Sequence, residues 1–326
     1  MSARNSRVTY GLLMVAAFLS VLGLLGCRAS EADYPTKPVT MVVYVSPGGQ
    51  LDLFGREAAR QVEKMLKVPM PVENRAGGGG LTALSYIKSQ PADGYNIAMA
   101  TVSLLYAMAA PDSPVAVTDF DWIIRQNTEP FLLAVKGDGQ FKTLEDLVRV
   151  AKANPGKVKM GGTGTGGIQD GIALRFSTLA GIQTTWVPFD SGKDASVATL
   201  GGHLDAFIAT PSTPRPLLQD GSLRGLAITS EKRSEFMLNL PTFKEQGFDV
   251  VESQWRGVVV KKGTPANVEV KLHDSFKQLM DTPEWKEYNT KNWVSDYYLG
   301  TEALGKEAAK GVEDARTLLK QLGAIK

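Results

Sequence analysis

The sequence has few of the residues on which metal and thiol chemistry depend. Its 326 residues include one cysteine, Cys27, and two histidines, His203 and His273. A single cysteine permits no disulfide within the chain and no thiol cluster that could hold a metal. Metal-dependent and Ser/His catalysis are therefore poorly supported, and we expect both histidines to be ordinary surface or packing residues. An enzyme that works with acids or lysine alone stays open.

An excess of charge of either sign is also missing. The chain has 36 Lys and Arg against 34 Asp and Glu, and without residues 1–27, which hold Arg4 and Arg7 and no acid, the count is 34 against 34. A neutral chain lacks the basic face that nucleic-acid binding usually requires. No strict repeat or low-complexity tract is present, and a hydrophobic content of 43% supports packed cores. A length of 326 residues predicts two domains.

Residues 1–27 have the pattern of a targeting segment. An uncharged run of roughly 16 residues, 11–26, follows Arg4 and Arg7 and is shorter than the ~20 residues of a spanning helix. It ends in Leu24-Leu25-Gly26-Cys27, which resembles a bacterial lipobox. We expect lipidation of Cys27, which would tether the folded chain to the membrane surface without spanning it. A plain secretory signal is the alternative, and both place the mature chain outside the cytoplasm.

Strands alternate with helices along the mature chain. Apolar runs predict strands at 39–45, 70–73, 95–101, 131–135, 157–160, 186–189, 206–209, 223–228 and from Trp255 onward. Helical spacing and caps predict helices at 51–65, 81–88, 143–153, 168–179, 194–200, 214–220, 264–280 and 302–321. This order predicts parallel sheets covered by helices on both faces. Two such α/β units, joined by strands near Phe131 and Val258, predict a two-lobed clamp with a cleft.

Two glycine-rich turns are the main candidates for a binding site. Each lies between a predicted strand and a helix: 46–49, followed by Asp52, and 161–167, followed by Asp170. Backbone N–H groups at a helix N-terminus bind anions, carboxylates as readily as phosphates. Either turn could instead be only a tight connection. The two acids could complement the helix dipole or accept hydrogen bonds from a ligand, water or a neighbouring amide.

A nucleotide-binding interpretation is also possible for the second turn. Gly162, Gly164 and Gly167 match G-x-G-x-x-G, and Asp190 follows at the end of the next strand, where an acid could bind a ribose. A single motif of this kind, in mid-chain of an exported protein without evident hydride-transfer residues, is weak evidence. We therefore favour a short carboxylate over a dinucleotide.

Other residues fit both a binding and a structural role. Arg75 and Arg256 could be charge partners for a polyanion, although packing and salt bridges are the commoner roles of such residues. Trp186 and Phe189 could form a wall of a cleft or belong to a core.

A series of short segments gives a more specific comparison. In order they are Tyr34-Pro35 with Lys37-Pro38, Ser46-Pro47-Gly48-Gly49 with Asp52, Val72-Glu73-Asn74-Arg75-Ala76-Gly77-Gly78-Gly79, Asp93-Gly94-Tyr95, Asn154-Pro155-Gly156-Lys157-Val158, the 161–167 turn with Asp170, Val187-Pro188-Phe189, Gly201-Gly202-His203-Leu204-Asp205-Ala206, Gly221-Ser222-Leu223-Arg224-Gly225-Leu226-Ala227, Pro241-Thr242-Phe243-Lys244-Glu245-Gln246-Gly247, Trp255-Arg256-Gly257-Val258-Val259 and Glu284-Trp285. Together they resemble the periplasmic receptors of tripartite tricarboxylate transporters, the Bug-type solute-binding proteins. The last two segments point to the tricarboxylate branch, and the resemblance covers residues 34–322.

This resemblance implies a fold and its division into lobes. The fold is the type II periplasmic-binding-protein fold, with two α/β lobes joined by two crossover strands. We expect residues 1–27 to be a lipoprotein-type signal peptide, residues 28–135 and 255–326 to form lobe 1, and residues 136–254 to form lobe 2. The lobes should close about hinge strands near 131–136 and 251–261.

In such receptors two opposed turns hold a ligand carboxylate, partly through water. Carried onto this sequence, with Thr210 and Ser212 in a further cleft-facing loop, the expected substrate-binding residues are Ser46, Gly48, Gly49, Asp52, Thr163, Gly164, Thr165, Gly166, Asp170, Thr210 and Ser212. Two features depart from the family pattern. Gln50-Leu51 replaces smaller residues, and Gly171 stands where a histidine often follows the acid.

The implied function is that of an extracytoplasmic receptor without catalytic activity or cofactor. It would capture a small di- or tricarboxylate such as citrate and deliver it to the integral-membrane subunits of a tripartite transporter. We expect a monomer, tethered in the periplasm of a Gram-negative bacterium. A ligand sensor that feeds a signalling kinase is the alternative.

Overall fold

The computed structural model describes residues 34–321, 323 and 325. Every helix and strand described below belongs to the compact unit that begins at Pro38. The expected signal peptide and Cys27 lie outside the described residues. Within the part of the chain that is described, no helix combines the length and hydropathy needed to span a bilayer.

A seven-stranded mixed sheet forms the first lobe. Its strand order is β10-β4-β11-β3-β1-β2, and β12 also pairs with β4. The bounds are β1 Thr40–Val43, β2 Val72–Asn74, β3 Asn96–Thr101, β4 Phe120–Pro130, β10 Ser253–Gln254, β11 Arg256–Lys261 and β12 Ser295–Gly300. β1 runs parallel to β2 and β3, whereas β11 is antiparallel to both β3 and β4.

A five-stranded mixed sheet forms the second lobe, in the order β7-β6-β8-β5-β9. The bounds are β5 Leu132–Lys136, β6 Val158–Thr163, β7 Thr184–Phe189, β8 Ala206–Ala209 and β9 Leu223–Ile228. β6 is parallel to β7 and β8, and β5 is antiparallel to β8 and β9. The predicted parallel pairing is therefore present in part of each sheet, and the remaining pairs are antiparallel. β5 and β11 each follow a passage of the chain from one sheet to the other. Each runs antiparallel to the strands on both of its sides.

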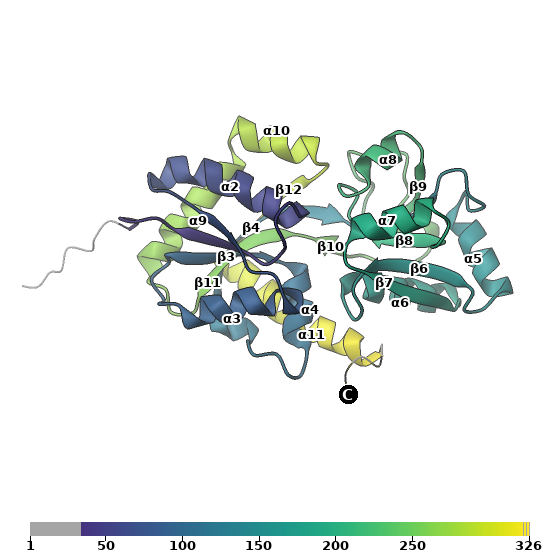
Figure 1. Ribbon diagram of the computed structural model, residues 1–326, viewed down its shortest axis with the longest axis horizontal. Coiled ribbons are helices and arrows are strands. Elements are labelled where there is room, and N and C mark those ends of the chain that lie inside the picture. Colours follow the sequence, from purple (N-terminus) through teal and green to yellow (C-terminus); the bar gives the residue numbers. More distant parts are fainter. Residues whose placement is uncertain (1–33, 322, 324, 326) are drawn as a thin grey trace, which may run out of the picture. The chain divides into compact units, whose positions relative to one another are not determined.

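Helices cover both faces of each sheet (Figure 1). In the first lobe α2, α9 and α10 lie on one face and α3, α4 and α11 on the other; in the second, α5 and α6 lie opposite α7 and α8. The bounds are α2 Gln50–Leu66, α3 Leu81–Ser89, α4 Val102–Ala109, α5 Leu144–Ala153, α6 Ile168–Ala180, α7 Gly192–Leu200, α8 Arg215–Gln219, α9 Ala266–Met280, α10 Pro283–Lys291 and α11 Thr301–Gln321, with short 3₁₀ turns η1 Gly78–Gly80, η2 Val117–Asp119 and η3 Lys244–Gln246. The chain thus has the two-lobed α/β fold expected from the sequence.

The helix ends follow local chemistry. The predicted capping box of α5 is present, because Thr143 Oγ1 accepts the Asp146 N–H and Asp146 Oδ2 accepts the Thr143 N–H, both at 3.1 Å. At α9 the sequence pattern predicts Thr264 as the N-cap and Pro265 as the first helical residue, one residue too early. Thr264 donates its hydroxyl to the Lys261 carbonyl at 2.8 Å, so Pro265 takes the N-cap position and Ala266 begins the helix.

The chain crosses between the sheets at two short segments. It leaves the first sheet at Pro130 and enters the second at Leu132. β5, which the sequence placed in lobe 1, therefore pairs within the five-stranded sheet, where its apolar residues are buried on both faces. The return passage ends where Ser253 pairs with Pro130 of β4. Pro130 and its partner strand β10 thus lie where the two sheets meet.

Candidate functional site

The two predicted glycine turns have the same local geometry. Gly49 and Gly167 are the N-cap residues of α2 and α6, both in extended conformation and neither with a side-chain cap. The residue before each cap, Gly48 or Gly166, has a positive φ of 81° or 72°, which favours glycine. In each turn that glycine donates its N–H to the acid four residues later. The two lobes therefore present the same turn at the start of a helix.

Both carboxylate oxygens of the acid in the first turn accept hydrogen bonds from the turn and from neighbouring side chains. Asp52 Oδ2 accepts the Gly48 N–H at 2.8 Å and Arg56 Nε at 3.0 Å, and Asp52 Oδ1 accepts Asn74 Nδ2 at 2.7 Å. Asn74 Nδ2 also donates to the Val45 carbonyl at 3.0 Å. Burial raises the pKa of Asp52, but the bonds from Arg56, Gly48 and Asn74 outweigh it and hold this pKa below its ordinary value. Asp52 thus fixes the loop between β1 and α2.

The acid of the second turn has much weaker support. Asp170 Oδ2 accepts the Gly166 N–H at 3.0 Å, and the side chain is buried. Burial raises the pKa of Asp170, and the bond from Gly166 offsets this only in part. Within the described part of the chain, no cation is among the groups that set its pKa. The two acids therefore hold the same position in their turns but lie in opposite electrostatic environments.

A tryptophan and a glutamine hold the rest of the second turn. Trp186 Nε1 donates to the Gly164 carbonyl at 2.8 Å, and the Gly164 N–H donates to the Phe189 carbonyl at 3.0 Å. Gln169 Oε1 accepts the Thr163 N–H. Thr163, Gly164 and Thr165 are exposed, as are Ser46 and Gly48 of the first turn. The sequence indicates for Trp186 only a place in a cleft wall or in a core. In the structure its indole N–H binds the turn directly and helps to shape it.

The third predicted segment, the loop with Thr210 and Ser212, lies where the two sheets meet. Thr210 and Ser212 follow β8, are each 9% exposed, and their hydroxyl oxygens are 3.3 Å apart. The Ser212 N–H donates to Glu129 Oε1 of β4 at 2.9 Å. Glu129 Oε2 in turn accepts Arg256 Nη2 of β11 at 3.1 Å. A fully buried ion pair of the first sheet therefore holds a loop of the second. No local pattern indicated Glu129, because an acid in a polar stretch is usually a surface residue.

Polar groups also gather at the carboxyl edge of the first sheet. Tyr44, just after β1, has its hydroxyl 2.5 Å from Thr101 Oγ1, and Thr101 caps α4 by accepting the Ser103 N–H at 3.1 Å. Burial raises the pKa of Tyr44, opposed by the bond to Thr101 and by the nearby charge of Arg256. Ligands of open α/β sheets bind at this edge.

Arg75, weighed as a charge partner for a polyanion, and His273, expected to be an ordinary residue, both make contacts within the fold. The Arg75 guanidinium stacks on the Tyr86 ring at 3.5 Å and pairs with Glu73 at 2.6 Å. His273 hydrogen-bonds Asp274 and Tyr298, each at 2.9 Å. Among the described residues, no group of three or more His, Cys, Asp or Glu side chains could hold a metal ion.

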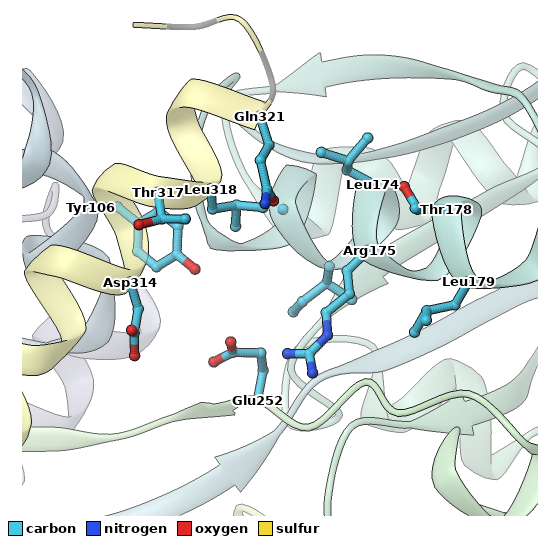
Figure 2. A pocket seen from close by; sticks show the side chains of 12 residues that line it. Tyr106, Leu174, Arg175, Thr178, Leu179, Glu252, Asp314, Thr317, Leu318 and Gln321 are labelled. Atoms are coloured by element: carbon cyan, nitrogen blue, oxygen red, sulfur yellow. The ribbon is translucent and has the colours of Figure 1, made fainter.

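A cavity of about 680 Å³ lies away from the glycine turns, between α6, α11 and Tyr106 of α4 (Figure 2). Figure 2 shows Arg175 and Glu252 directed toward the same space. Burial raises the pKa of Glu252, and the charge of Arg175 opposes this shift. None of the expected substrate-binding residues lines this cavity.

Comparisons with known proteins agree with this architecture. The chain is 33% identical over 320 residues to a UPF0065 protein in the gbd 5' region of Cupriavidus necator, covering 96% of both chains, and 28% identical over 276 residues to protein BugT of Bordetella pertussis, covering 83% and 84%. A TctC solute-binding protein from Polaromonas superposes with a TM-score of 0.75 at 25% identity, covering 88% of this chain and 99% of that one.

Two solved structures with bound ligands have the same fold. R. palustris Rpa4515 with adipate gives a TM-score of 0.81 at 24% identity, covering 89% and 99% of the two chains. MatC from Rhodopseudomonas palustris with bound malate gives 0.78 at 21% identity, covering 88% and 100%. The family described as "Tripartite tricarboxylate transporter family receptor" matches residues 54–324. The resemblance found in the sequence is thereby confirmed, and the chain belongs to the family of tripartite tricarboxylate transporter receptors.

Proposed function

We propose that this receptor captures a small di- or tricarboxylate, such as citrate, between its two lobes and delivers it to the integral-membrane subunits of a tripartite transporter. The observation that carries the proposal is the pair of matching glycine turns, one at the start of α2 and one at the start of α6. Each combines a helix N-terminus with exposed backbone that hydrogen bonds hold in place, which suits a carboxylate. The adipate and malate bound to two proteins of the same fold are consistent with this ligand class.

Each part of the predicted site has a distinct role in this proposal. The exposed hydroxyls of Ser46, Thr163 and Thr165 donate to the ligand without adding charge. Asp52 and Asp170 act indirectly, since each holds the N–H of the glycine before its helix. Thr210 and Ser212 form the base of the cleft beside the crossing segments. Closure about these segments would bring the two turns onto one carboxylate, and the ligand would favour the closed state.

A ligand panel tests the proposal. The mature chain from residue 28 onward is heated with citrate, malate, succinate, adipate, matched monocarboxylates and NAD. A ligand present at 100 times its Kd stabilises the folded state by about 2.7 kcal/mol, which raises Tm by several degrees. We expect this shift with at least one di- or tricarboxylate and none with NAD. Stabilisation by NAD alone, with every organic acid inactive, would contradict the proposal.

Membrane tethering through Cys27 is a separate part of the proposal. It rests on the lipobox-like sequence and is tested in cells rather than in the folded domain. The wild-type chain should fractionate with membranes and carry acyl chains detectable by mass spectrometry, whereas Cys27→Ser should be released or remain unprocessed. An unmodified cysteine in exported wild-type protein would leave a plain secretory signal as the explanation.

A further inference from the structure

Arg256 has a buried hydrogen-bond donor without a partner. The residue is 3% exposed. Its Nη2 donates to Glu129 Oε2 at 3.1 Å and its backbone N–H donates to Asn127 Oδ1 at 2.9 Å. Within the part of the chain that the structure describes, its Nη1 has no hydrogen-bond partner. A buried donor of a charged group is costly to leave unpaired. The guanidinium therefore has capacity for one more acceptor.

The surroundings of this guanidinium place it at the base of the proposed cleft. Arg256 pairs in register with Thr101, the last residue of β3, and its charge influences Tyr44, the residue after β1. Its Cζ lies 5.2 Å from the centre of the Phe54 ring, two residues after Asp52 in α2. On its other side, Glu129 connects it to the Ser212 N–H of the second lobe. Arg256 thus lies next to α2, the helix that follows the first turn, and at the carboxyl edge of the first sheet, and Glu129 links it to the loop with Thr210 and Ser212.

We propose that Arg256 Nη1 binds a second carboxylate of the ligand while the two glycine turns hold the first. This inference rests on the proposed function and adds its selectivity: Arg256 distinguishes di- and tricarboxylates from monocarboxylates. A hydrogen bond between two charged groups is stronger than one between neutral groups. A monocarboxylate would leave Nη1 unpaired, and sites built to hydrogen-bond a group discriminate strongly against ligands that lack it. We expect a preference of roughly 10- to 100-fold.

A purely structural role for Arg256 would be to neutralise Glu129, and the test must separate the two roles. The measured quantity is the ratio of Kd for a monocarboxylate to Kd for the dicarboxylate of the same length, by calorimetry, using butyrate with succinate, valerate with glutarate and hexanoate with adipate. Both affinities come from the same protein preparation, so a loss of folded protein cancels in the ratio. Tm and circular dichroism follow folding separately.

The two partners of the ion pair should act in opposite directions. Arg256→Gln should lower the ratio by about 10- to 100-fold. Glu129→Gln should keep or raise it, because the remaining arginine charge is then free to attract the second carboxylate. Arg256→Lys should recover part of the ratio, since lysine keeps the charge and loses the planar fork. The double variant of Arg256→Gln and Glu129→Gln restores neutrality. Its ratio should be as low as that of Arg256→Gln alone.

Arg125 provides a matched control. It is 5% exposed, lies in the neighbouring strand β4 and is paired with Glu307 at 2.5 Å. Arg125→Gln should reduce Tm and leave the ratio unchanged. An Arg256→Gln protein that binds ligand with the wild-type ratio would overturn the inference, as would a wild-type chain that binds butyrate as tightly as succinate. A wild-type chain that binds no carboxylate at all would overturn the proposed function and this inference with it.

Discussion

Gly257 of β11 passes so close to Ile124 of β4 that a Cβ at position 257 would lie 2.4 Å from the Ile124 carbonyl oxygen. The two strands are paired here, and the pairing has an irregularity between Val258 and Val259. Backbone atoms cannot move aside as a flexible side chain can. The glycine therefore fixes the strand next to Arg256, and with it the position of the guanidinium.

Gly257→Ala should reduce stability by about 2–4 kcal/mol, because the new methyl group displaces β11 from β4. The control is Gly305→Ala in α11, where a Cβ would meet no atom within 4 Å. That change should raise stability by about 0.5–1 kcal/mol, since alanine favours the helix. Urea denaturation of both variants measures the difference, and equal stability of the two would contradict the expected close approach.

The two turn acids should respond differently to loss of charge. Asp52→Asn removes an acceptor from Arg56 and Asn74 and should cost about 1–2 kcal/mol near neutral pH. Asp170→Asn should leave stability unchanged or raise it by up to about 1 kcal/mol, because among the described residues the Gly166 N–H is the only hydrogen-bond partner of the buried charge. Thermal denaturation near neutral pH compares them, and a larger loss in Asp170→Asn would refute the assignment.

The same acids predict opposite pH dependences. The folded pKa of Asp52 is lowered, so its contribution is present above the ordinary value near 3.8 and is lost as pH falls through the lower, folded pKa. The folded pKa of Asp170 is raised, so the folded chain binds the proton more tightly and stability falls as pH rises from 3.8 through the folded value. Denaturation curves across this acidic range should show each effect vanish in the corresponding Asn variant.

Bulky residues in the exposed turns should abolish binding without unfolding the protein. Gly48 and Gly164 have φ of 81° and 67°, and a Cβ at either would meet no atom within 4 Å. Replacement by leucine therefore costs only the strain of the backbone, about 1–2 kcal/mol. Gly181, at the other end of α6, has a φ of 62° and equally open surroundings. Gly181→Leu should share the strain and keep full affinity. Binding that survives both turn variants would place the site elsewhere.

Trp186 should report on the second turn. Trp186→Phe removes the hydrogen bond to the Gly164 carbonyl, so it should weaken ligand binding by about 3- to 10-fold and cost about 1 kcal/mol of stability. Three other tryptophans, Trp122, Trp255 and Trp285, are buried in the first lobe. We expect ligand to change the wild-type fluorescence and to have much less effect on the variant. An unchanged fluorescence response in Trp186→Phe would assign the signal to another residue.

The sequence predicted the elements whose pattern is local. The order of strand, glycine turn and helix was visible at both turns, because apolar runs and glycines depend on neighbours in sequence. β4, Phe120–Pro130, was missed, since its apolar run Trp122-Ile123-Ile124 is short and the rest of the strand is polar. Two of its buried charged residues have distant partners, Glu307 for Arg125 and Arg256 for Glu129. Pairs more than 100 residues apart leave no mark in a local pattern.

The same limit applies to the site. The turns and both acids were identified from residue type and spacing, and the equivalence of their hydrogen bonds follows from that spacing. The difference between the acids was not predictable, because it depends on Arg56 and Asn74 beside Asp52 and on the lack of a cation acting on Asp170. The link from Ser212 to Glu129 likewise depends on how the crossing segments bring the sheets together.

The carboxylates that brace the two turns also affect how long a ligand stays. In the first proposed half-site Arg56 offsets the charge of Asp52, whereas in the second the charge of Asp170 lies behind the donors without a cation among the groups that set its pKa in the described part of the chain, so a bound anionic ligand is attracted by the backbone and repelled by Asp170. In the proposed receptor this repulsion raises the dissociation rate. The ligand would then dissociate within the time of a transport cycle. For a receptor that must release its ligand to membrane subunits, timely dissociation matters more than the highest possible affinity.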